Sequence, residues 1–377
     1  MEGWYGKKTI SASMKKFNLK KIDSYIIMKF LGTYFGAIAL IILIAVVFDF
    51  SEKIDDFLET NAPLHSIIFD YYMNFIPYFA VLFAPLFTFI AVIFFTSRMA
   101  YNTEIIAILS SGVSFPRLLY PYFIAASFIM MFNLLLGNYV IPEANHKRFI
   151  FEEKYYHKVP KGFEGRNVHK QIEPGIFVYL ESYNTRNNYG RRFSIEKFEK
   201  GELVSKLMSQ EIRWDTALHT WEIRNYYIRD YIDGKQIITQ GNELDTAINL
   251  DPAEFRMRDN VVEAMSLKQL NHFIDNQRMQ GSAKVNQLLV ERNKRFSFPF
   301  STYILTLIGV SVSSRKVRGG IGMHIGIGLL VSFSYILFLQ FSAQYAISGE
   351  LPPFIATWLP NFIFAFIALY LYKLAPK

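Results

Sequence analysis

The stretch IIMKFLGTYFGAIALIILIAVVF, residues 26–48, contains only one charged residue, Lys29. A helix needs about 20 predominantly apolar residues to cross the roughly 30 Å hydrocarbon core of a bilayer, so this run predicts a membrane span. The run is too long for the apolar part of a cleaved signal peptide, and no small-residue cleavage site follows it. We therefore expect a protein that is retained in a membrane.

Further runs of similar composition follow in the 377-residue chain, at residues 67–95, 118–141, 296–312, 323–347 and 354–372. The composition agrees, because 51% of the residues are hydrophobic and only 19% are charged, whereas charged residues make up about 25% of a typical soluble domain. The chain has no cysteine, which excludes disulfides, thiolate zinc sites and thiol nucleophiles. The sequence thus predicts a membrane α-helical bundle of six transmembrane helices.

The orientation of the spans follows from the basic residues, because Lys and Arg are enriched in short cytoplasmic loops. These residues are Lys7, Lys8, Lys15, Lys16, Lys20, Lys21 and Lys29 at the N-terminus, Arg315, Lys316 and Arg318 between the fourth and fifth spans, and Lys373 and Lys377 at the C-terminus. The loops after the first and fifth spans are acidic. Both termini are therefore expected in the cytoplasm, and the net charge of +8 is assigned to topology rather than to a nucleic-acid partner.

The polar segment between the third and fourth spans is long enough to form a domain of its own on the far side of the membrane. The period-two pattern of half-buried strands occurs at Ile176, Val178, Leu180, Phe193, Ile195, Ile212 and Trp214. The pairs Lys200-Gly201 and Asp233-Gly234 are typical of hairpin turns. Closely spaced strands predict an inserted all-β domain, an antiparallel sandwich or roll, at residues 142–265.

Helical patterns return after residue 265. Ser266 and Gln269 form a capping box, and Gly281 is placed to end the helix. A second helix from about Ala283 runs into the fourth span. The predicted organisation is a cytoplasmic segment at 1–25, three spans at 26–141, the β domain at 142–265, connecting helices at 266–295 and three spans at 296–377.

No segment matches GxxxxGK[ST], HExxH or GxSxG, and the seven histidines have no metal-ligand spacing. We therefore predict a protein that is not an enzyme, with no catalytic residue, no metal site and no cofactor bound by this chain. Ionisable residues are absent from the centres of the six runs, whereas ion-coupled carriers place such residues deep in the membrane. If the protein moves a substrate, the energy must come from another subunit.

The stretch RMAYNTEIIAILSSGVSFPR, residues 98–117, separates the second and third spans on the expected cytoplasmic side. Asn102 or Thr103 can cap a helix, Glu104 suits its first turn, and Gly112 is placed to end it. This pattern predicts a short helix at about 102–112, which either lies on lipid or docks a cytoplasmic partner. We favour docking of a partner, because a segment that only connects two spans does not need start and end signals for a helix. The candidate contacts are Arg98, Glu104, Ile105, Ile108, Leu109 and Gly112.

Small residues and prolines mark other parts of the bundle. Gly322, Gly326 and Gly328 begin the fifth span, where small residues allow close helix approach, either within the bundle or to a second subunit. Prolines inside apolar runs predict kinked helices, and they are Pro77, Pro85, Pro299 and Pro360.

Several motifs recur in a characteristic order from about Asp23 onwards. They are Ile22-Asp23-x-Tyr25-Ile26, Glu104-x-x-Ala107-x-x-Ser110-x-Gly112-x-Ser114, Pro142-Glu143, Trp221-x-Ile223-x-Asn225, Met265-Ser266-x-x-Gln269-Leu270, Leu351-Pro352-Pro353 and Trp358-Leu359-Pro360-Asn361. Their order and spacing resemble the lipopolysaccharide-export permease family of the LptF/LptG type, over nearly the whole chain.

This resemblance implies the transmembrane subunit of an ABC transporter in the bacterial inner membrane, with six spans and a periplasmic β-jellyroll. Two such subunits pair, usually as a heterodimer, and bind two copies of a cytoplasmic LptB-type ATPase, which carries ATP and Mg. A single-span LptC-type protein and a periplasmic LptA-type bridge accompany them. The family extracts lipopolysaccharide from the membrane and passes it through the jellyroll to the bridge. A non-transporting scaffold, whose β domain recruits an envelope partner, is the alternative.

The resemblance also indicates which residues meet the lipid. In the family, the cavity lies between the first span of one subunit and the fifth span of the other, which here points to Phe48, Phe50, Lys53, Phe338, Phe341, Gln344 and Tyr345. Helix packing or contact with bulk lipid is the alternative role of these side chains. The path through the jellyroll would involve Ile212, Trp214, Trp221 and Ile223. Family members often carry several basic residues outside the first span, whereas Lys53 lies among acids.

Overall fold

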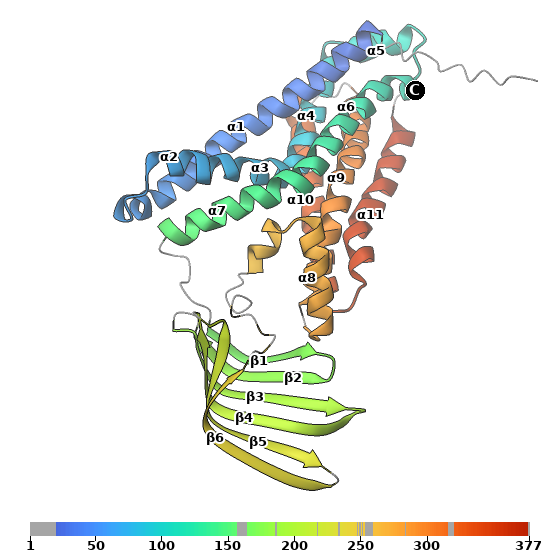
Figure 1. The fold of residues 1–377 in the computed structure, drawn as a ribbon. Coiled ribbons are helices and arrows are strands. Elements are labelled where there is room, and N and C mark those ends of the chain that lie inside the picture. Colours follow the sequence, from blue (N-terminus) through green and yellow to red (C-terminus); the bar gives the residue numbers. More distant parts are fainter. Residues whose placement is uncertain are drawn as a thin grey trace, which may run out of the picture.

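The computed structural model describes residues 20–156, 164–184, 187–216, 218–232, 234–246, 248, 250, 252, 259–282, 284–315 and 320–375. Within these residues, six helices are long and apolar enough to cross a membrane, and an all-β domain is inserted between the third and the fourth of them (Figure 1). The predicted fold class is therefore confirmed. Residues 1–19, with most of the basic N-terminal segment, and Asp233, Ala283, Lys316, Arg318 and Lys377 lie outside the described residues.

The elements follow one another in three groups. Before the β domain they are α1 (Lys21–Glu59), α2 (Leu64–Ser66), η1 (Ile67–Tyr72), α3 (Met73–Leu82), α4 (Ala84–Tyr101), α5 (Glu104–Ser110), α6 (Phe115–Leu135), η2 (Leu136–Val140) and α7 (Ile141–Tyr155). The strands are β1 (Glu164–Glu173), β2 (Ile176–Asn184), β3 (Tyr189–Glu199), β4 (Glu202–Asp215), β5 (Thr220–Ile232) and β6 (Lys235–Thr246). After them come η4 (Asp259–Ala264), α8 (Leu267–Met279), α9 (Val285–Ser313), α10 (Gly320–Ile347) and α11 (Pro353–Leu374).

The predicted second span is not one continuous helix. The π-helix η1 and the helix α3 are followed by a break at Phe83, and α4 begins one residue later. Pro85 lies in the first turn of α4, where its missing N–H has no intrahelical partner to lose. Pro77, by contrast, lies inside α3. The candidate membrane helix is therefore Ala84–Tyr101.

The boundary predicted for the β domain at residue 142 is wrong. The third membrane helix continues through η2 and α7 to Tyr155, and the first strand begins only at Glu164. Pro142 lies in the first turn of α7 and does not end the helix. Ion pairs between side chains four residues apart, Glu143–Lys147 and Arg148–Glu152, support α7 after the apolar pattern stops.

The helices after the β domain agree with their sequence signals. Ser266 accepts a hydrogen bond from the Gln269 N–H, and the Gln269 side chain accepts one from the Ser266 N–H, which completes the capping box of α8. Gly281, with φ of 64°, follows the end of this helix. The helix α9 then runs without interruption from the connecting region into the fourth membrane span.

The β domain is a single antiparallel sheet over the described residues, with its strands in the order β1-β2-β3-β4-β5-β6. Hairpins connect neighbouring strands, so the curved sheet visible in Figure 1 is a meander. Lys200 and Gly201 both have positive φ, as the predicted tight turn between β3 and β4 requires. One face of the sheet carries a core that includes Val178, Leu180, Tyr183, Phe193, Ile212, Trp221 and Ile223, covered in part by Leu250.

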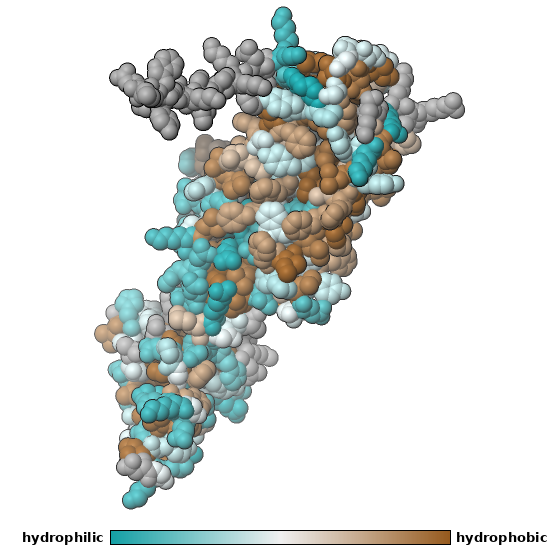
Figure 2. Space-filling view, turned by 90° about the vertical axis from the view of Figure 1, so that its right-hand side faces the viewer, coloured by the Kyte–Doolittle hydropathy of each residue, from teal (hydrophilic) through white to brown (hydrophobic). Residues whose placement is uncertain are grey.

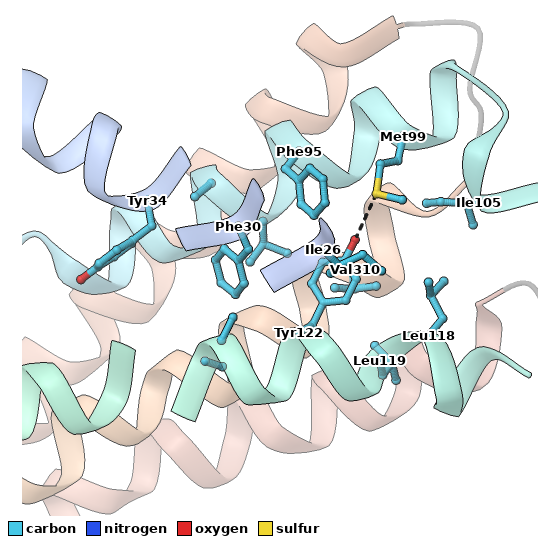
Figure 3. Packing of buried hydrophobic residues seen from close by; sticks show 14 of the residues in the cluster. Ile26, Phe30, Tyr34, Phe95, Met99, Ile105, Leu118, Leu119, Tyr122 and Val310 are labelled. Atoms are coloured by element: carbon cyan, nitrogen blue, oxygen red, sulfur yellow. Dashed lines mark hydrogen bonds between the residues drawn. The ribbon is translucent and has the colours of Figure 1, made fainter. Parts of the chain in front are cut away.

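The largest core of the helical bundle joins α1, α4, α5 and α6 (Figure 3). Phe30 of α1 and Tyr122 of α6 are fully buried and face each other with ring centroids 6.2 Å apart. The Tyr122 hydroxyl, which would be costly without a partner in this apolar core, lies 3.0 Å from Thr96 Oγ1. A Cβ at Gly328 would lie 2.6 Å from Ile93, so this glycine permits close packing of α10 on α4.

The molecule has two chemically different ends. Figure 1 places the start of α1, the helix α5 and the C-terminal end at one end, and the β domain at the other. Figure 2 shows that hydrophobic residues dominate the surface of the helical region between them, whereas the β domain is mixed and largely hydrophilic. This arrangement is that of a multi-pass membrane protein with an extramembrane domain.

Candidate functional site

The short helix predicted between the second and third spans is present as α5, and its two ends are set by the backbone. Thr103 adopts the left-handed conformation, with φ of 63°, and its hydroxyl donates to the Asn102 carbonyl oxygen at 2.6 Å. Thr103 occupies the N-cap position, as one of the two predicted alternatives, but its side chain makes no capping hydrogen bond. Gly112 has φ of 86° and follows the helix, which a residue with a Cβ adopts only with strain.

The apolar residues of α5 divide between two faces. Ile105 is buried, and Ile108 and Leu109 pack on the core of the bundle. These three residues therefore attach the helix to the protein, and in this conformation Ile105 is not available to a partner. The exposed apolar side chains are Ile106, which is 52% exposed, and Tyr101. Sequence reasoning missed Ile106, which lies about 100° around the helix from the buried Ile105.

Glu104 is held by the start of α1. Its Oε2 atom accepts a hydrogen bond from the Tyr25 hydroxyl at 3.2 Å, and its Oε1 atom accepts one from Asn102 Nδ2 at 3.3 Å. Arg98 is exposed at the end of α4 nearby. The acid is thus oriented by two neutral donors while it stays partly accessible.

A bidentate ion pair joins α1 to α6 at the same end of the molecule. Arg117 donates from both terminal nitrogens to the two carboxylate oxygens of Asp23, each at 2.7 Å. The Asp23 side chain is 1% exposed and the Arg117 side chain 35%. The Lys20 N–H also donates to Asp23. Asp23 belongs to one of the sequence motifs, but no signal in the sequence pairs it with Arg117, which lies 94 positions further along the chain.

These contacts form what we call the α5 unit: Asp23 and Tyr25 of α1, α5 itself, and Arg117 of α6. The Glu104–Tyr25 hydrogen bond joins α5 to α1, and the Arg117–Asp23 pair joins α1 to α6. Both involve a carboxylate, and such charge-assisted hydrogen bonds are stronger than neutral ones. The α5 unit therefore ties a short helix at one end of the bundle to two membrane helices.

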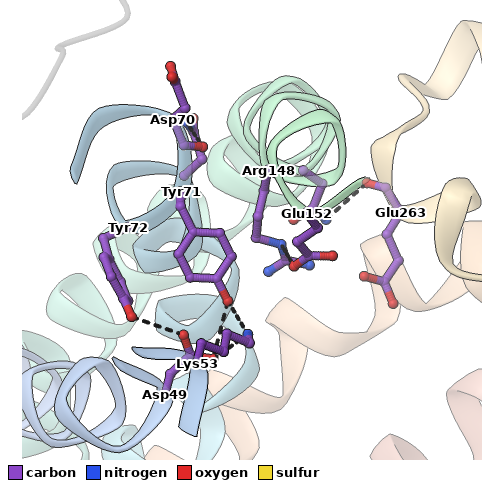
Figure 4. A network of polar contacts seen from close by, with 10 residues as sticks. Asp49, Lys53, Asp70, Tyr71, Tyr72, Arg148, Glu152 and Glu263 are labelled. Atoms are coloured by element: carbon purple, nitrogen blue, oxygen red, sulfur yellow. Dashed lines mark hydrogen bonds and ion pairs between the residues drawn. The ribbon is translucent and has the colours of Figure 1, made fainter. Parts of the chain in front are cut away.

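The opposite end of α1 carries a polar network, which Figure 4 shows. Lys53 Nζ lies 2.6 Å from Asp49 Oδ1 and also donates to the Tyr71 hydroxyl. Tyr72 donates to the second Asp49 oxygen at 3.2 Å. Because the ammonium group of Lys53 is already paired and mostly buried, it is poorly placed to meet the phosphates of a lipid from another subunit. Its role in a substrate cavity stays a prediction that this geometry does not favour.

The other candidate cavity residues are divided between α1 and α10, which pack on different neighbours in the chain. The helix α1 packs on α3, α4 and α6, whereas α10 packs on α4, α9 and α11. Phe48, Phe341 and Tyr345 are each more than half exposed, and Gln344 is exposed too. Phe50 packs between Phe57 and Tyr72. Phe338 is half-buried against the core of α9 and α10.

The four candidate residues of the β domain lie on one face of two paired strands. Ile212 of β4 pairs with Ile223 of β5, and Trp214 pairs with Trp221. Ile212, Trp221 and Ile223 are fully buried, and Trp214 packs against the same core. The structure thus brings the predicted set together, and Leu250 covers part of it: the Trp221 indole donates to the Leu250 carbonyl oxygen at 2.8 Å.

A model of one protein family, described as lipopolysaccharide export system permease LptF/LptG, matches residues 24–374. The chain belongs to the LptF/LptG family. A comparison with curated proteins finds no match. This LptF/LptG protein is therefore a permease of a lipopolysaccharide export system, and the family motifs that it carries can be assigned physical roles.

Two of the motifs position helices. Asp23 and Tyr25 of the first motif hold the α5–α6 region, as described above. Asn361 of the last motif is buried; it accepts from the Tyr335 hydroxyl at 2.9 Å and donates to the Ser297 carbonyl oxygen at 2.8 Å. It thereby ties α9, α10 and α11 together with hydrogen bonds inside the apolar bundle.

A layer of charged residues lies where the chain returns from the β domain to the bundle. Arg295 of α9 donates to the carbonyl oxygens of Met265 and Val262, at 2.7 and 2.9 Å. Asn145 of α7 is fully buried and donates to the Glu263 carbonyl oxygen at 3.3 Å. The return segment η4 is thus clamped between two helices that also enter the membrane.

The Glu263 carboxyl group predicts a pH-dependent stability. Its burial, reinforced by Glu291 and Glu152, raises its pKa to about 7, although Arg148 and Arg295 act in the opposite direction. Folding raises this pKa, so the folded protein holds the Glu263 proton more tightly than the unfolded chain does. The resulting contribution to folding stability is complete below the ordinary pKa near 4.5 and is lost as the pH rises through about 7. The melting temperature of the detergent-solubilised protein should therefore fall between about pH 5 and about pH 8 relative to that of Glu263→Gln. Equal pH profiles would contradict this assignment.

Proposed function

We propose that this LptF/LptG protein is the transmembrane subunit of an ABC transporter that extracts lipopolysaccharide from the bacterial inner membrane and passes it toward a periplasmic bridge. The observation that carries the proposal is the separation of the α5 unit and the β domain at opposite ends of the bundle. The sequence contains no nucleotide-binding motif. A cytoplasmic ATPase of the LptB type, with its ATP and Mg, would act on the α5 unit.

Extraction requires external energy because each buried CH₂ of an acyl chain is stabilised by about 0.8 kcal/mol. An apolar cavity between two permease subunits would keep this cost low. The exposed Phe48 on α1 and Phe341 and Tyr345 on α10 support such a cavity, because these aromatic side chains are not covered by the chain's own helices. A Cβ at Gly322 or Gly326 would meet no neighbour within 4 Å, which leaves that part of α10 open to a second subunit.

The remaining assignments follow from this orientation. Both termini would lie in the cytoplasm and the β domain in the periplasm. A single-span LptC-type protein and an LptA-type bridge would receive the lipid from the β domain, whose apolar core offers a path of the right chemistry. The path would open only after the segment at Leu250 moves away from Trp221.

The docking role of α5 is tested by two charge changes. Glu104→Arg should repel a basic residue of the ATPase, and Ile106→Asp should place a charge in an apolar contact. Because truncating a paired interface charge costs about 2–5 kcal/mol, each variant should bind the ATPase at least about tenfold more weakly. The measurement is the amount of ATPase that co-purifies with the membrane subunit.

The control is Glu350→Arg, at an exposed position after α10, which should leave co-purification unchanged. If both α5 variants retain the ATPase at the wild-type level, α5 is not the docking helix. If the wild-type protein carries no ATPase at all, the alternative of a non-transporting scaffold is favoured.

A further inference from the structure

A cavity of about 310 Å³ lies inside the chain, between α3, η2, η4, α9 and α10. This volume is at the lower end of the range of about 300–1,000 Å³ that is usual for small-molecule sites. Leu339 and Gln340 of α10 line the cavity, but none of the residues expected to line a cavity between subunits does. Its walls differ in chemistry from one end to the other.

The end next to η4 is charged. Glu263 of η4 and Glu291, Lys294 and Arg295 of α9 line it. The Arg295 side chain is 7% exposed. It donates hydrogen bonds to the Met265 and Val262 carbonyl oxygens, and its Nε atom lies 4.0 Å from the Glu291 carboxylate. Among the described residues, no ion pair is found for Lys294 or for the carboxylate of Glu263, and in Figure 4 no dashed line joins that carboxylate to Arg148 or Glu152. In the described part of the chain, one cation and one partly buried carboxyl group thus face the cavity without an ion pair within 4.0 Å, although Arg148 and Arg295 lie near enough to lower the pKa of Glu263.

The rest of the lining is mostly apolar. It includes Leu82, Phe298, Pro299 and Leu339, together with the polar Asn133 and Gln340. Glu291 and Pro299 are eight positions apart on α9, which corresponds to roughly 12 Å along a helix. The cavity therefore matches an amphiphile with a charged head at the end of the membrane helices and an apolar tail that reaches into the bundle.

We propose that this cavity binds a zwitterionic glycerophospholipid of the surrounding bilayer, with its phosphate at Lys294, its ammonium group at Glu263 and part of one acyl chain between α3 and α9. The charges select this headgroup: an anionic phospholipid would satisfy Lys294 but leave Glu263 opposite a second anion. A neutral lipid would leave both charges unpaired, which is costly in a partly buried site. The bound lipid would connect η4, which follows the β domain, to α3 and α9. The site does not depend on the exported substrate.

The test compares phosphatidylethanolamine with phosphatidylglycerol. The full-length protein is reconstituted in nanodiscs that contain equal amounts of both lipids, released into mild detergent, and the retained phospholipids are counted by native mass spectrometry. Wild-type protein should retain phosphatidylethanolamine about tenfold more than phosphatidylglycerol, as expected for one additional ion pair of about 1.4 kcal/mol. Glu263→Gln and Lys294→Gln should each remove most of this preference. Equal retention of the two lipids, or retention of glycolipid alone, would overturn the proposal.

Two kinds of control keep the result interpretable. Glu350→Gln and Lys268→Gln change exposed residues and should leave retention unchanged. Gly137 lines the cavity, and a Cβ there would meet nothing within 4 Å, so Gly137→Leu should fill the cavity without disturbing the fold. Loss of bound phosphatidylethanolamine in Gly137→Leu, with an unchanged melting temperature, is expected. Full retention in this variant would show that the lipid binds elsewhere.

A further readout uses the proton on Glu263. Without lipid, burial keeps the pKa of Glu263 near 7, and an adjacent ammonium group should lower it. Phosphatidylethanolamine should therefore bind more tightly at about pH 8 than at about pH 6, and Glu263→Gln should abolish this difference. Binding that is independent of pH in the wild type would contradict the placement of the ammonium group.

Discussion

Asp23→Ala is expected to break the ion pair that joins α1 to α6 and to destabilise the protein by about 2–3 kcal/mol. This value is at the lower end of the range for truncating one partner of a buried charge pair, because water reaches the partly exposed Arg117 side chain. Removal of the Asp23 carboxylate leaves two Arg117 nitrogens without the acceptors that lie 2.7 Å away in the wild type. Removal of an exposed surface charge has no such consequence. Denaturant unfolding in detergent measures the stability change, and the rate of substrate-coupled ATP hydrolysis in the assembled complex measures the mechanical effect.

A double-mutant cycle separates the pair from its surroundings. Arg117→Ala alone should cost a similar amount, and the double variant should cost clearly less than the sum of the two. Asp70→Ala serves as the matched control, because Asp70 is an exposed acid near the other end of the bundle. If Asp23→Ala were no more harmful than Asp70→Ala, the ion pair would not hold α1 to α6.

Trp221→Ala should have the largest effect in the β domain, a loss of about 3–5 kcal/mol of stability. The indole is fully buried and packs edge-on against Trp214, with ring centroids 5.1 Å apart. Its N–H also satisfies the Leu250 carbonyl oxygen. The substitution therefore leaves both a cavity and an unpaired acceptor. Limited proteolysis of the β domain across a denaturant series reports the change without interference from the membrane helices.

Trp221→Phe distinguishes the two contributions, because it keeps most of the packing but removes the hydrogen bond, which is worth about 0.5–1.5 kcal/mol. Ile237→Ala is the control, since Ile237 is 50% exposed on the edge strand β6 and should change stability little. If Trp221→Phe loosens the Leu250 segment and increases lipid crosslinking to Ile223, the path through the sheet opens as proposed. A β domain that tolerates Trp221→Ala as well as Ile237→Ala would show that this core does not hold the sheet.

Local signals predicted most of the elements correctly. The capping box at Ser266, the glycine after α5 and the turn at Lys200-Gly201 all act within a few residues, and the structure contains each of them. The errors arose where neighbouring elements override a local signal. Pro142 is an ordinary helix terminator by sequence, but α7 continues past it because α7 packs on α3 and η4. Ile105 is apolar and was grouped with docking residues, although the bundle core needs it.

The sequence by itself determined that the chain crosses a membrane six times and carries a β domain, because the cost of burying charge in lipid and the period of a strand are local properties. Only the tertiary structure decided which charges meet: Asp23 with Arg117, Lys53 with Asp49 and Tyr71, and Glu263 with an open cavity. Ion pairs and cavities between separate elements depend on helix positions that no short segment encodes. The same physical reason explains why the family motifs pointed to the right residues before their partners could be known.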